Sequence, residues 1–348
     1  MLAVAYCNFI LYCVGLLEVV ENIIDNILDI LFPHRIRYDF ELKGKTVLIT
    51  GCTRGIGKAC VECLTRRGAN IILACRDVPS AHKMSEMMQN VDPEQNCLVG
   101  KCTVAKLDLM SFDSILKCVE EIPTDTVRKI DVIICNAGIM APKKLEYSED
   151  GFESQLQVNH LGHMLLCDRL LRRKRKLGCS RIEKIIFVTS CAHFGALGNF
   201  LDDLNCEKHY QPKVQYCQTK LCNILIAKEF TKRMQQGSVY PTGKAISVHP
   251  GVVYTDLARD FCRKEFPRML QPIMSPILNC LFPLCLRKQE RAACLVSAVV
   301  SQDQETIYVS RGLIRRPSRI SQRADVSRRL WNWSINAHEL LHCIGQEN

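Results

Sequence analysis

The sequence predicts an α/β fold in which helices cover both faces of one doubly wound parallel sheet, preceded by an apolar amino-terminal helix. Three observations support this prediction. Short β-branched runs alternate with helical segments from residue 45 onward, and a glycine-rich loop follows the first run. Residues 2–17 carry no charge. We therefore expect an anchor and amphipathic helix at 1–40 and one α/β domain at 41–348.

The composition is that of a globular protein with an uneven distribution of charge. The 348 residues carry a net charge of +10, but residues 1–32 contain four acids and no Lys or Arg, which leaves about +14 for the remainder. This favours anionic partners such as nucleotide phosphates, lipid headgroups or nucleic acid. The 21 cysteines indicate small buried thiols in a reducing compartment. Cys60-x-x-Cys63 has no second pair at zinc-like spacing, and we predict no metal site.

The amino-terminal segment is interpreted as a membrane anchor. As a helix, residues 2–17 span roughly 24 Å, short of the roughly 30 Å hydrocarbon core. Acidic residues then recur every three or four positions, giving an amphipathic helix that should stop at Pro33. Arg35 and Arg37 follow the anchor, which favours a domain facing the cytosol. The alternatives are a soluble helix covering the domain and, less favoured, a cleaved signal peptide.

The first part of the domain has the order strand, glycine loop, helix, strand. Lys45–Thr50 is predicted as a buried strand, the next helix should run to about Arg67, and Asn70–Cys75 should be the second strand. The loop between them reads Gly51-Cys52-Thr53-Arg54-Gly55-Ile56-Gly57. Glycines let the backbone approach a pyrophosphate, and the helix amino terminus offers N–H groups to it.

The Gly-x3-Gly-x-Gly spacing resembles that of the short-chain dehydrogenase/reductase superfamily, and most closely its membrane-associated, retinol-dehydrogenase-like branch. Motifs recur in the family's order from Gly44 to Leu341. The resemblance implies a Rossmann-type catalytic domain that binds a nicotinamide cofactor. The cofactor-binding residues that it implies are Gly51, Thr53, Arg54, Gly55, Ile56, Gly57, Arg76, Asp108, Leu109, Asn136, Ala137, Gly138, Tyr216, Lys220, Pro250, Gly251, Val253 and Thr255.

The end of the second strand favours NADP(H) over NAD. Enzymes that bind NAD normally place an acid there to hold the ribose 2′-hydroxyl. This chain has Arg76 instead, with Arg54 in the glycine loop, and two guanidiniums suit a 2′-phosphate. Asp77 is the competing acid, but it follows one or two positions too late.

The middle of the chain supplies further motifs. Val104–Asp108 and Ile130–Ile134 are predicted as the third and fourth strands, and Asn136-Ala137-Gly138 follows the latter. In the family, an Asn at the position of Asn159 holds a helix kink and a water chain. His160 and His163 are spaced for metal binding, but the family uses none. The basic run at 172–176 should face solvent, with attraction to anionic lipid as the alternative.

The catalytic candidates are Asn159, Ser190, Tyr216 and Lys220. Ser190 should lie at the carboxyl end of a fifth strand, and one helical turn separates Tyr216 from Lys220. An ammonium there should lower the pKa of the phenol, which then transfers a proton to or from the substrate oxygen. The resemblance implies that Ser190 orients that oxygen, Lys220 also holds the nicotinamide ribose, and Asn159 supports the proton path.

The last part of the domain is predicted to close over the substrate. A sixth strand at 245–248 leads to Pro250-Gly251, and residues 254–286 form the expected flap, apolar and interrupted by prolines. A flap beside an anchor suggests a lipophilic substrate that enters from the bilayer, whereas core packing is the alternative. Residues 311–323 are expected to form a flexible basic loop.

These features favour an NADP(H)-dependent, membrane-bound oxidoreductase acting on a retinoid, steroid, polyprenoid or fatty aldehyde. The alternative is a non-catalytic NADP-binding scaffold of the same fold. Nucleic-acid binding is disfavoured because no recognised module is present. We expect the endoplasmic reticulum membrane, with the lipid-droplet surface as an alternative, and leave a homodimer open.

Overall fold

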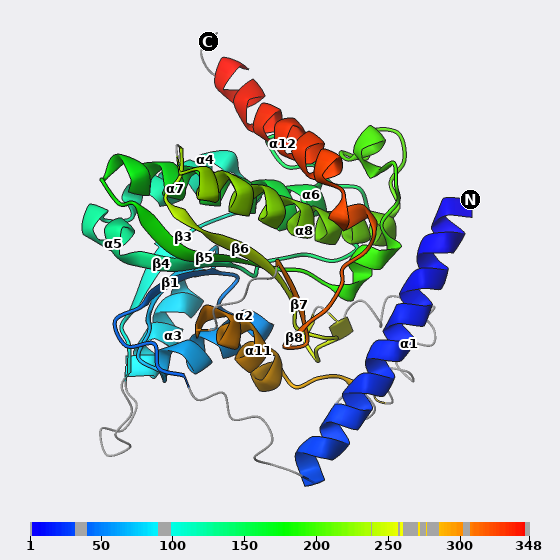
Figure 1. Ribbon diagram of the computed structural model, residues 1–348, viewed down its shortest axis with the longest axis horizontal. Coiled ribbons are helices and arrows are strands. Elements are labelled where there is room, and N and C mark those ends of the chain that lie inside the picture. Colours follow the sequence, from blue (N-terminus) through cyan, green and yellow to red (C-terminus); the bar gives the residue numbers. More distant parts are fainter. Residues whose placement is uncertain are drawn as a thin grey trace.

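The computed structural model describes residues 2–31, 40–89, 99–237, 239–256, 258–259, 271, 276, 285–301 and 307–344 (Figure 1). The strands are β1 Thr46–Thr50, β2 Asn70–Cys75, β3 Cys102–Lys106, β4 Ile130–Cys135, β5 Arg181–Val188, β6 Thr242–His249, β7 Tyr308–Ser310 and β8 Leu313–Ile314. The α-helices are α1 Leu2–Leu31, α2 Gly55–Thr65, α3 Val78–Gln89, α4 Phe112–Glu121, α5 Thr124–Lys129, α6 Ser154–Leu156, α7 Gly162–Lys176, α8 Pro212–Gln236, α11 Gln289–Ser301 and α12 Ala324–Ile344. Other helical segments are η2 Gln157–Leu161, η3 Cys191–Gly195, η4 Phe200–Asp203 and η5 Ile320–Gln322.

The strands form one sheet in the order β3-β2-β1-β4-β5-β6-β7-β8. All neighbours pair in parallel except β7 and β8, which pair in antiparallel fashion. The chain order reverses between β1 and β4, and such a switch point opens a crevice at the carboxyl ends of the strands. The doubly wound parallel sheet is therefore confirmed, and the β7–β8 hairpin is an addition at its edge that the sequence did not reveal.

Helices cover both faces of the sheet, as predicted. In Figure 1, α2, α3 and α11 lie on one side, and α4, α7, α8 and α12 on the other. Strand β1 is buried throughout, and its side chains alternate between the two faces. Leu48 joins the core beneath α7 and α8, whereas Val47 and Ile49 join the core beneath α2 and α11. Strands packed on both faces show a continuous apolar run, which is why this one was recognisable.

Two predicted strand ends shift in the structure. β3 is Cys102–Lys106, because it pairs residue for residue with β2 from Ile71 to Cys75, and Asp108 therefore lies beyond it. β5 ends at Val188. Ser190 is then the residue that precedes and caps the 3₁₀ turn η3.

The basic run at 172–176 does more than face solvent. Arg172 binds Asp168 with an Nε–Oδ1 distance of 2.8 Å. Arg173 donates to the carbonyls of Val119 and Ile122, and the buried Lys174 donates to the carbonyl of Arg128 at 2.5 Å. Arg173 and Lys174 complete backbone acceptors at the ends of α4 and α5, so the solvent-facing prediction is wrong for these two residues. Arg172, Arg175 and Lys176 are exposed, as predicted.

Helix α1 is one continuous helix of 30 residues that ends two positions before Pro33. It lies alongside the domain, beside the end of α8 and η3 (Figure 1). Its segment Val4–Ile27 is long and apolar enough to cross a membrane, judged by length and composition. The predicted flap at 254–286 falls largely outside the described residues.

Candidate active site

The predicted site residues gather at one edge of the sheet. Gly51 follows β1, Arg76 follows β2, Asn136 follows β4, Ser190 lies two residues after β5, and Pro250 follows β6. Because the carboxyl ends of parallel strands share an edge, residues that lie up to 200 positions apart in sequence meet there.

The glycine loop is folded tightly against residues 136–138. Gly51 and Gly55 have φ values of +64° and +55°, which favour glycine. A Cβ at Gly57 would lie 2.1 Å from the Gly51 carbonyl oxygen, and one at Gly51 would lie 2.8 Å from Ala137 Cα. Only glycine fits at these two close approaches.

The amino terminus of α2 is available to an anion. The helix begins at Gly55, and no side chain caps it, since Arg54 makes no capping hydrogen bond. Thr53 lies in the loop before it and Ile56 in its first turn. The N–H groups at the start of α2 are uncapped and lie next to the glycine loop of residues 51–57, which we call the glycine cradle. Such an arrangement suits a pyrophosphate. The residues present therefore fit a dinucleotide.

Asn136 and Thr50 tie the ends of β1 and β4 together. The Asn136 side-chain amide donates to the carbonyls of Thr50 and Gly51 at 3.0 and 3.2 Å. The Thr50 hydroxyl accepts from the backbone N–H groups of Asn136 and Ala137, both at 3.0 Å. This network fixes the loop that carries Gly138.

At the end of β2, Arg76 is exposed and Asp77 is already engaged. The Asp77 carboxylate accepts from the backbone N–H and hydroxyl of Ser80, at 3.1 and 2.7 Å, in the first turn of α3. These hydrogen bonds, followed by the charges of Arg54 and Arg76, lower the pKa of Asp77. The acid that could compete for a ribose is thus held at a helix end.

Two further segments complete the nucleotide side. Asp108 accepts from the Met110 N–H at 3.0 Å, and Leu109 is buried beside Gly162. After β6, Val253 forms an isolated bridge with Arg287. Thr255 Cγ2 lies 3.4 Å from the position of a Cβ on Gly55, so the segment after Pro250-Gly251 reaches the glycine loop.

The four catalytic candidates converge beside this cradle. Tyr216 and Lys220 lie one turn apart on α8, and Lys220 Nζ is 5.6 Å from the Tyr216 ring centroid. Ser190 lies close enough to Tyr216 to act on the pKa of its phenol, and the Ser190 hydroxyl oxygen accepts from the Ala192 N–H at 3.2 Å. Lys220 Nζ donates to the Val188 carbonyl at 3.1 Å.

Asn159 lies within the π-helical segment η2, between α6 and α7. Its Oδ1 accepts from the Ile139 N–H at 2.9 Å, and its Nδ2 donates to the Ile139 carbonyl and the Thr219 hydroxyl, both at 3.0 Å. Regular α-helical pairing is therefore interrupted at Asn159. A π-bulge often marks a functional position, and this one links α7 to α8 beside Lys220.

The pKa of Tyr216 differs from the sequence-based expectation. Burial raises the pKa of Tyr216, although the hydrogen bond from Ser190 opposes this. Burial also lowers the pKa of Lys220 to about 8. The predicted lowering of the Tyr216 pKa is therefore not seen in the protein alone. The Lys220 ammonium faces the Tyr216 ring and donates to the Val188 carbonyl, and its effect on the phenol is smaller than the effect of burial.

The two histidines at metal-like spacing are core residues. His163 Nε2 lies 2.8 Å from the Thr50 hydroxyl, and His160 Nε2 lies 2.8 Å from the Ser334 hydroxyl. Burial lowers their pKa values to about 4 and about 3, so both are neutral near pH 7. They point to different partners and do not share a ligand position.

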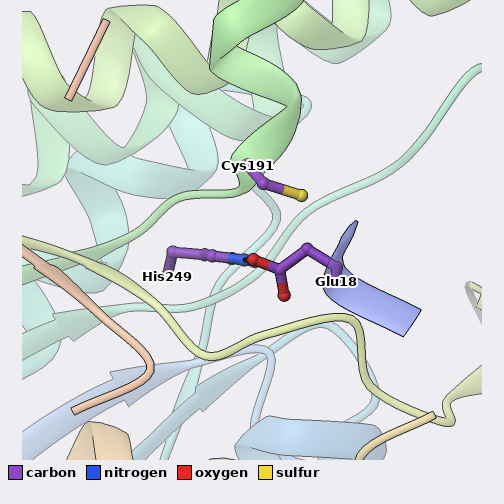
Figure 2. Close-up of side chains that lie close together, drawn as sticks. All are labelled: Glu18, Cys191 and His249. Atoms are coloured by element: carbon purple, nitrogen blue, oxygen red, sulfur yellow. Dashed lines mark ion pairs between the residues drawn. The ribbon is translucent and has the colours of Figure 1, made fainter. Parts of the chain in front are cut away.

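Sequence reasoning missed a second cluster next to Ser190. Glu18 and His249 are buried and Cys191 is half-buried, and their ligand-type atoms lie within 4.8 Å of one another (Figure 2). His249 Nε2 is 3.3 Å from Glu18 Oε1. Although burial alone would lower the pKa of His249, Cys191 and then Glu18 raise it to about 9. The sequence offered one indication of this cluster, namely that two of its members adjoin predicted site residues: Cys191 follows Ser190, and His249 precedes Pro250.

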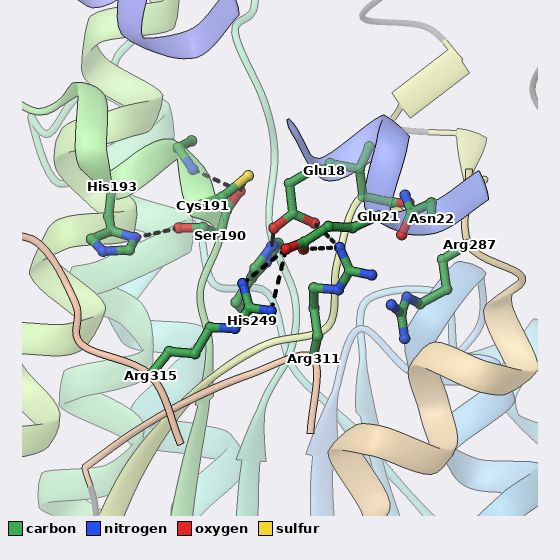
Figure 3. Close-up of polar contacts among 12 residues, drawn as sticks. Glu18, Glu21, Asn22, Ser190, Cys191, His193, His249, Arg287, Arg311 and Arg315 are labelled. Atoms are coloured by element: carbon green, nitrogen blue, oxygen red, sulfur yellow. Dashed lines mark hydrogen bonds and ion pairs between the residues drawn. The ribbon is translucent and has the colours of Figure 1, made fainter. Parts of the chain in front are cut away.

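Arginines surround this cluster. Arg311 Nη1 lies 3.5 Å from Glu18 Oε2, and Figure 3 shows Arg311 reaching toward Glu18 and Glu21. Arg287 forms an ion pair with Asp25 of α1, with an Nη2–Oδ2 distance of 2.6 Å. A metal dication here would meet two guanidiniums at short range, so we interpret the cluster as an ion-pair network.

Comparison with known proteins agrees with the fold and the motif order. The family model described as short chain dehydrogenase matches residues 45–265. Retinol dehydrogenase 13 of Homo sapiens is 35% identical over 295 residues, covering 83% of each chain. Retinol dehydrogenase 12 of Homo sapiens is 38% identical over 226 residues, covering 64% of this chain and 66% of that one.

Solved structures show the same fold. A crystal structure of an uncharacterised protein from Mycobacterium paratuberculosis aligns with a TM-score of 0.64 at 27% identity, covering 86% of this chain and 95% of that one. A 3-ketoacyl-(acyl-carrier-protein) reductase from Brucella melitensis, solved in complex with NADH, aligns with a TM-score of 0.54 at 18% identity, covering 78% and 100%. The latter likeness concerns the fold alone.

The chain belongs to the short-chain dehydrogenase family, in its retinol-dehydrogenase-like branch. It is accordingly an oxidoreductase that transfers a hydride, acts on alcohols and uses a nicotinamide cofactor. Its first helix is long and apolar enough to cross a membrane, which suggests membrane association.

Proposed function

We propose that the protein is an NADP(H)-dependent oxidoreductase that interconverts the alcohol and carbonyl forms of a lipophilic substrate. The convergence of Ser190, Tyr216, Lys220 and Asn159 beside the glycine cradle supports it most directly. The relatives named retinol dehydrogenases support a substrate of the retinoid, steroid, polyprenoid or fatty aldehyde class.

The side chains have distinct roles in this proposal. When bound, the nicotinamide supplies the hydride chemistry. Ser190 holds the substrate oxygen beside the Tyr216 hydroxyl, which gives a proton during reduction and takes it during oxidation. Lys220 is next to Gly138 and Asn159, where it can meet the nicotinamide ribose and bring positive charge to the phenol. Asn159 links the Thr219 hydroxyl to residue 139 and so orients the proton path.

The first test compares the wild type with Tyr216→Phe. NADPH oxidation is followed with a panel of lipophilic aldehydes and ketones. We expect kcat for the variant to fall at least about 100-fold, since a positioned proton donor contributes that much. NADPH binding, measured by fluorescence, should change less than about twofold and serves as the folding control. Equal rates would remove Tyr216 from the mechanism. Turnover with no carbonyl or alcohol would favour the scaffold alternative.

The preference for NADP(H) rests on Arg54, Arg76 and the engaged Asp77. Two exposed guanidiniums beside a ribose pocket favour a 2′-phosphate, and Asp77 is bound to Ser80. We expect Arg54→Ala with Arg76→Ala to raise KM for NADPH at least about 10-fold, because each charged hydrogen bond lost costs about 1.5–3 kcal/mol. KM for NADH should change less than about twofold. A parallel rise for both nucleotides would contradict the assignment.

For localisation, we propose the endoplasmic reticulum membrane with the catalytic domain in the cytosol, and the lipid-droplet surface as the alternative. The reduced cysteines among the described residues support a cytosolic domain. Asn332 lies exposed on α12 within an Asn-x-Ser sequon, so its glycosylation state reports the side of the membrane. A glycan on Asn332 would overturn the cytosolic placement. A homodimer stays open.

A further inference from the structure

Helix α1 turns its polar side toward the protein. Glu18 and Asn22 are buried, at 6% and 1% exposure. Asp25 binds Arg287, Arg291 and Arg311 at 2.6, 3.5 and 2.5 Å. Glu21 binds Arg311 and lies 3.3 Å from Arg315, so the arginine-rich segment after β7 receives the acidic face of α1 (Figure 3).

The opposite side of α1 is apolar and exposed. Within residues 4–27, where the side chains of α1 are described, every exposed residue is uncharged. The large exposed side chains are Tyr6, Phe9, Tyr12, Leu16, Leu17, Val20, Ile23, Ile24 and Ile27. Tyr12 and Leu17 are 72% and 64% exposed. A surface helix of a soluble protein has the reverse arrangement, and an apolar strip of this length marks an interaction site.

Helix α1 also packs on the segments that carry the catalytic groups. Cys7 Sγ lies 3.7 Å from Sγ of Cys217, the neighbour of Tyr216. A Cβ on Gly195, in the turn after Ser190, would lie 3.3 Å from Cys7 Sγ. Further along, Asn22 donates to the Val252 carbonyl at 3.1 Å, within the segment after β6.

We propose that α1 is an in-plane membrane helix that roofs the active site, with its apolar side in the acyl layer and its acidic side bound to the catalytic domain. A helix that left the domain to cross the bilayer would expose three carboxylates to hydrocarbon and leave buried arginines unpaired. In-plane helices usually have a basic polar face for lipid headgroups. Here the polar face is acidic because it meets arginines of the same chain.

The occupant of the apolar strip is lipid rather than a second copy of the chain. The strip extends along a helix of about 45 Å, carries no charge, and includes the aromatic residues Tyr6 and Tyr12 that favour a membrane interface. The inference rests on the proposed function only in placing the active site beneath the helix. Its tests measure topology, distance and partitioning, so they do not depend on turnover.

The first test asks on which side of the membrane the two ends of α1 lie. The full chain carries one epitope before Met1 and another at its carboxyl terminus, and sealed microsomes are treated with protease. We expect the two epitopes to share one fate, both digested or both protected until detergent is added. Opposite fates would show that α1 spans the bilayer and would overturn the proposal.

The second test asks whether α1 stays docked on a membrane. The full chain, bound to phosphatidylcholine vesicles, is oxidised with copper–phenanthroline and digested for mass spectrometry. We expect a Cys7–Cys217 linked peptide that disappears in Cys7→Ser. Cys13 is the matched control, because it lies on the same helix but about 120° around the axis and should give no link to Cys217. A missing Cys7–Cys217 link in the vesicle-bound wild type would overturn the docked arrangement.

The third test identifies the occupant. Leu16→Glu with Val20→Glu should lower partitioning onto phosphatidylcholine vesicles at least about 10-fold, because charge opposes insertion of the strip. Met87→Glu with Val239→Glu, two exposed apolar positions outside α1, should change it less than about twofold. If the α1 variant instead dissociated a dimer in detergent while its vesicle partitioning was unchanged, the strip would be a contact between copies and the lipid proposal would fail.

Discussion

At the scale of the residue, the glycine cradle depends on residues that have no side chain. Gly57 allows the first turn of α2 to contact the Gly51 carbonyl and the Asn136 amide, because a Cβ there would come within 2.1 and 2.5 Å of them. The catalytic groups depend instead on satisfied hydrogen bonds, as Asn159 shows with three partners at 2.9–3.0 Å. Both arrangements leave little freedom for substitution.

Gly57→Ala should therefore disrupt the cradle. The added methyl group must displace backbone, since the nearest atom is a carbonyl oxygen. We expect Kd for NADPH to rise at least about 10-fold and the free energy of unfolding to fall by about 1–3 kcal/mol. Fluorescence titration and denaturant unfolding in detergent measure the two effects. Gly198→Ala is the matched control, because a Cβ there meets nothing within 4 Å. Unchanged NADPH binding in Gly57→Ala would contradict the close approach.

At the scale of the element, the polar network between α1 and the domain is the most consequential arrangement. Arg311 contacts Glu18, Glu21 and Asp25 and is itself only 9% exposed. Buried ion pairs are costly to break because removing one partner leaves the others uncompensated. The segment at 311–323, expected to be a flexible basic loop, is in its first part the docking site of α1.

Arg311→Gln should consequently destabilise the folded protein by roughly 3 kcal/mol. Arg323→Gln is the control, because Arg323 also pairs with a carboxylate, that of Asp325. Both members of this pair are exposed, with 59% of the Arg323 side chain and 49% of the Asp325 side chain accessible to solvent. That control should leave the free energy of unfolding almost unchanged, because solvent screens an exposed ion pair. Denaturant unfolding of both variants in the same detergent measures the difference. Similar losses in the two variants would mean that Arg311 is not a buried partner of α1.

At the scale of the whole molecule, neutral histidines in three parts of the core make the fold sensitive to acid. Burial lowers the pKa values of His160, His163 and His193 to about 3, about 4 and about 4. The unfolded chain takes up protons near pH 6.5, whereas the folded chain does so only near pH 4 or below. Their stability contribution is therefore complete above pH 6.5 and is lost as the pH falls toward 4.

We expect the free energy of unfolding to be lower at pH 5 than at pH 7 by about 2 kcal/mol for each of these histidines. Denaturant unfolding across this range measures the slope. His193→Gln should reduce the slope of the free energy of unfolding against pH by the contribution of one histidine. His82→Gln, at an exposed position, should leave this slope unchanged. A curve that is flat between pH 7 and pH 5 would show that these side chains are solvated.

The features that could be predicted from the sequence were those encoded by a local motif. The βαβ unit, Asn136-Ala137-Gly138 and the one-turn spacing of Tyr216 and Lys220 were predictable because each is a continuous motif at a strand end or on a helix. The end of β3, the β7–β8 hairpin and the internal role of Lys174 were not, since pairing partners and distant carbonyls decide them. The pKa of Tyr216 was predicted in the wrong direction because desolvation is a property of the packed site.

By itself, the sequence determined the family, the order of the sheet-forming segments and the catalytic candidates, because these follow from spacing along one chain. Only the tertiary structure decided what surrounds them. It brought Glu18 beside Cys191 and His249, turned the acids of α1 toward arginines almost 300 residues away, and left an apolar strip facing outward. Periodicity shows that a helix has two faces, but which face is buried depends on the charges that the rest of the fold presents to it.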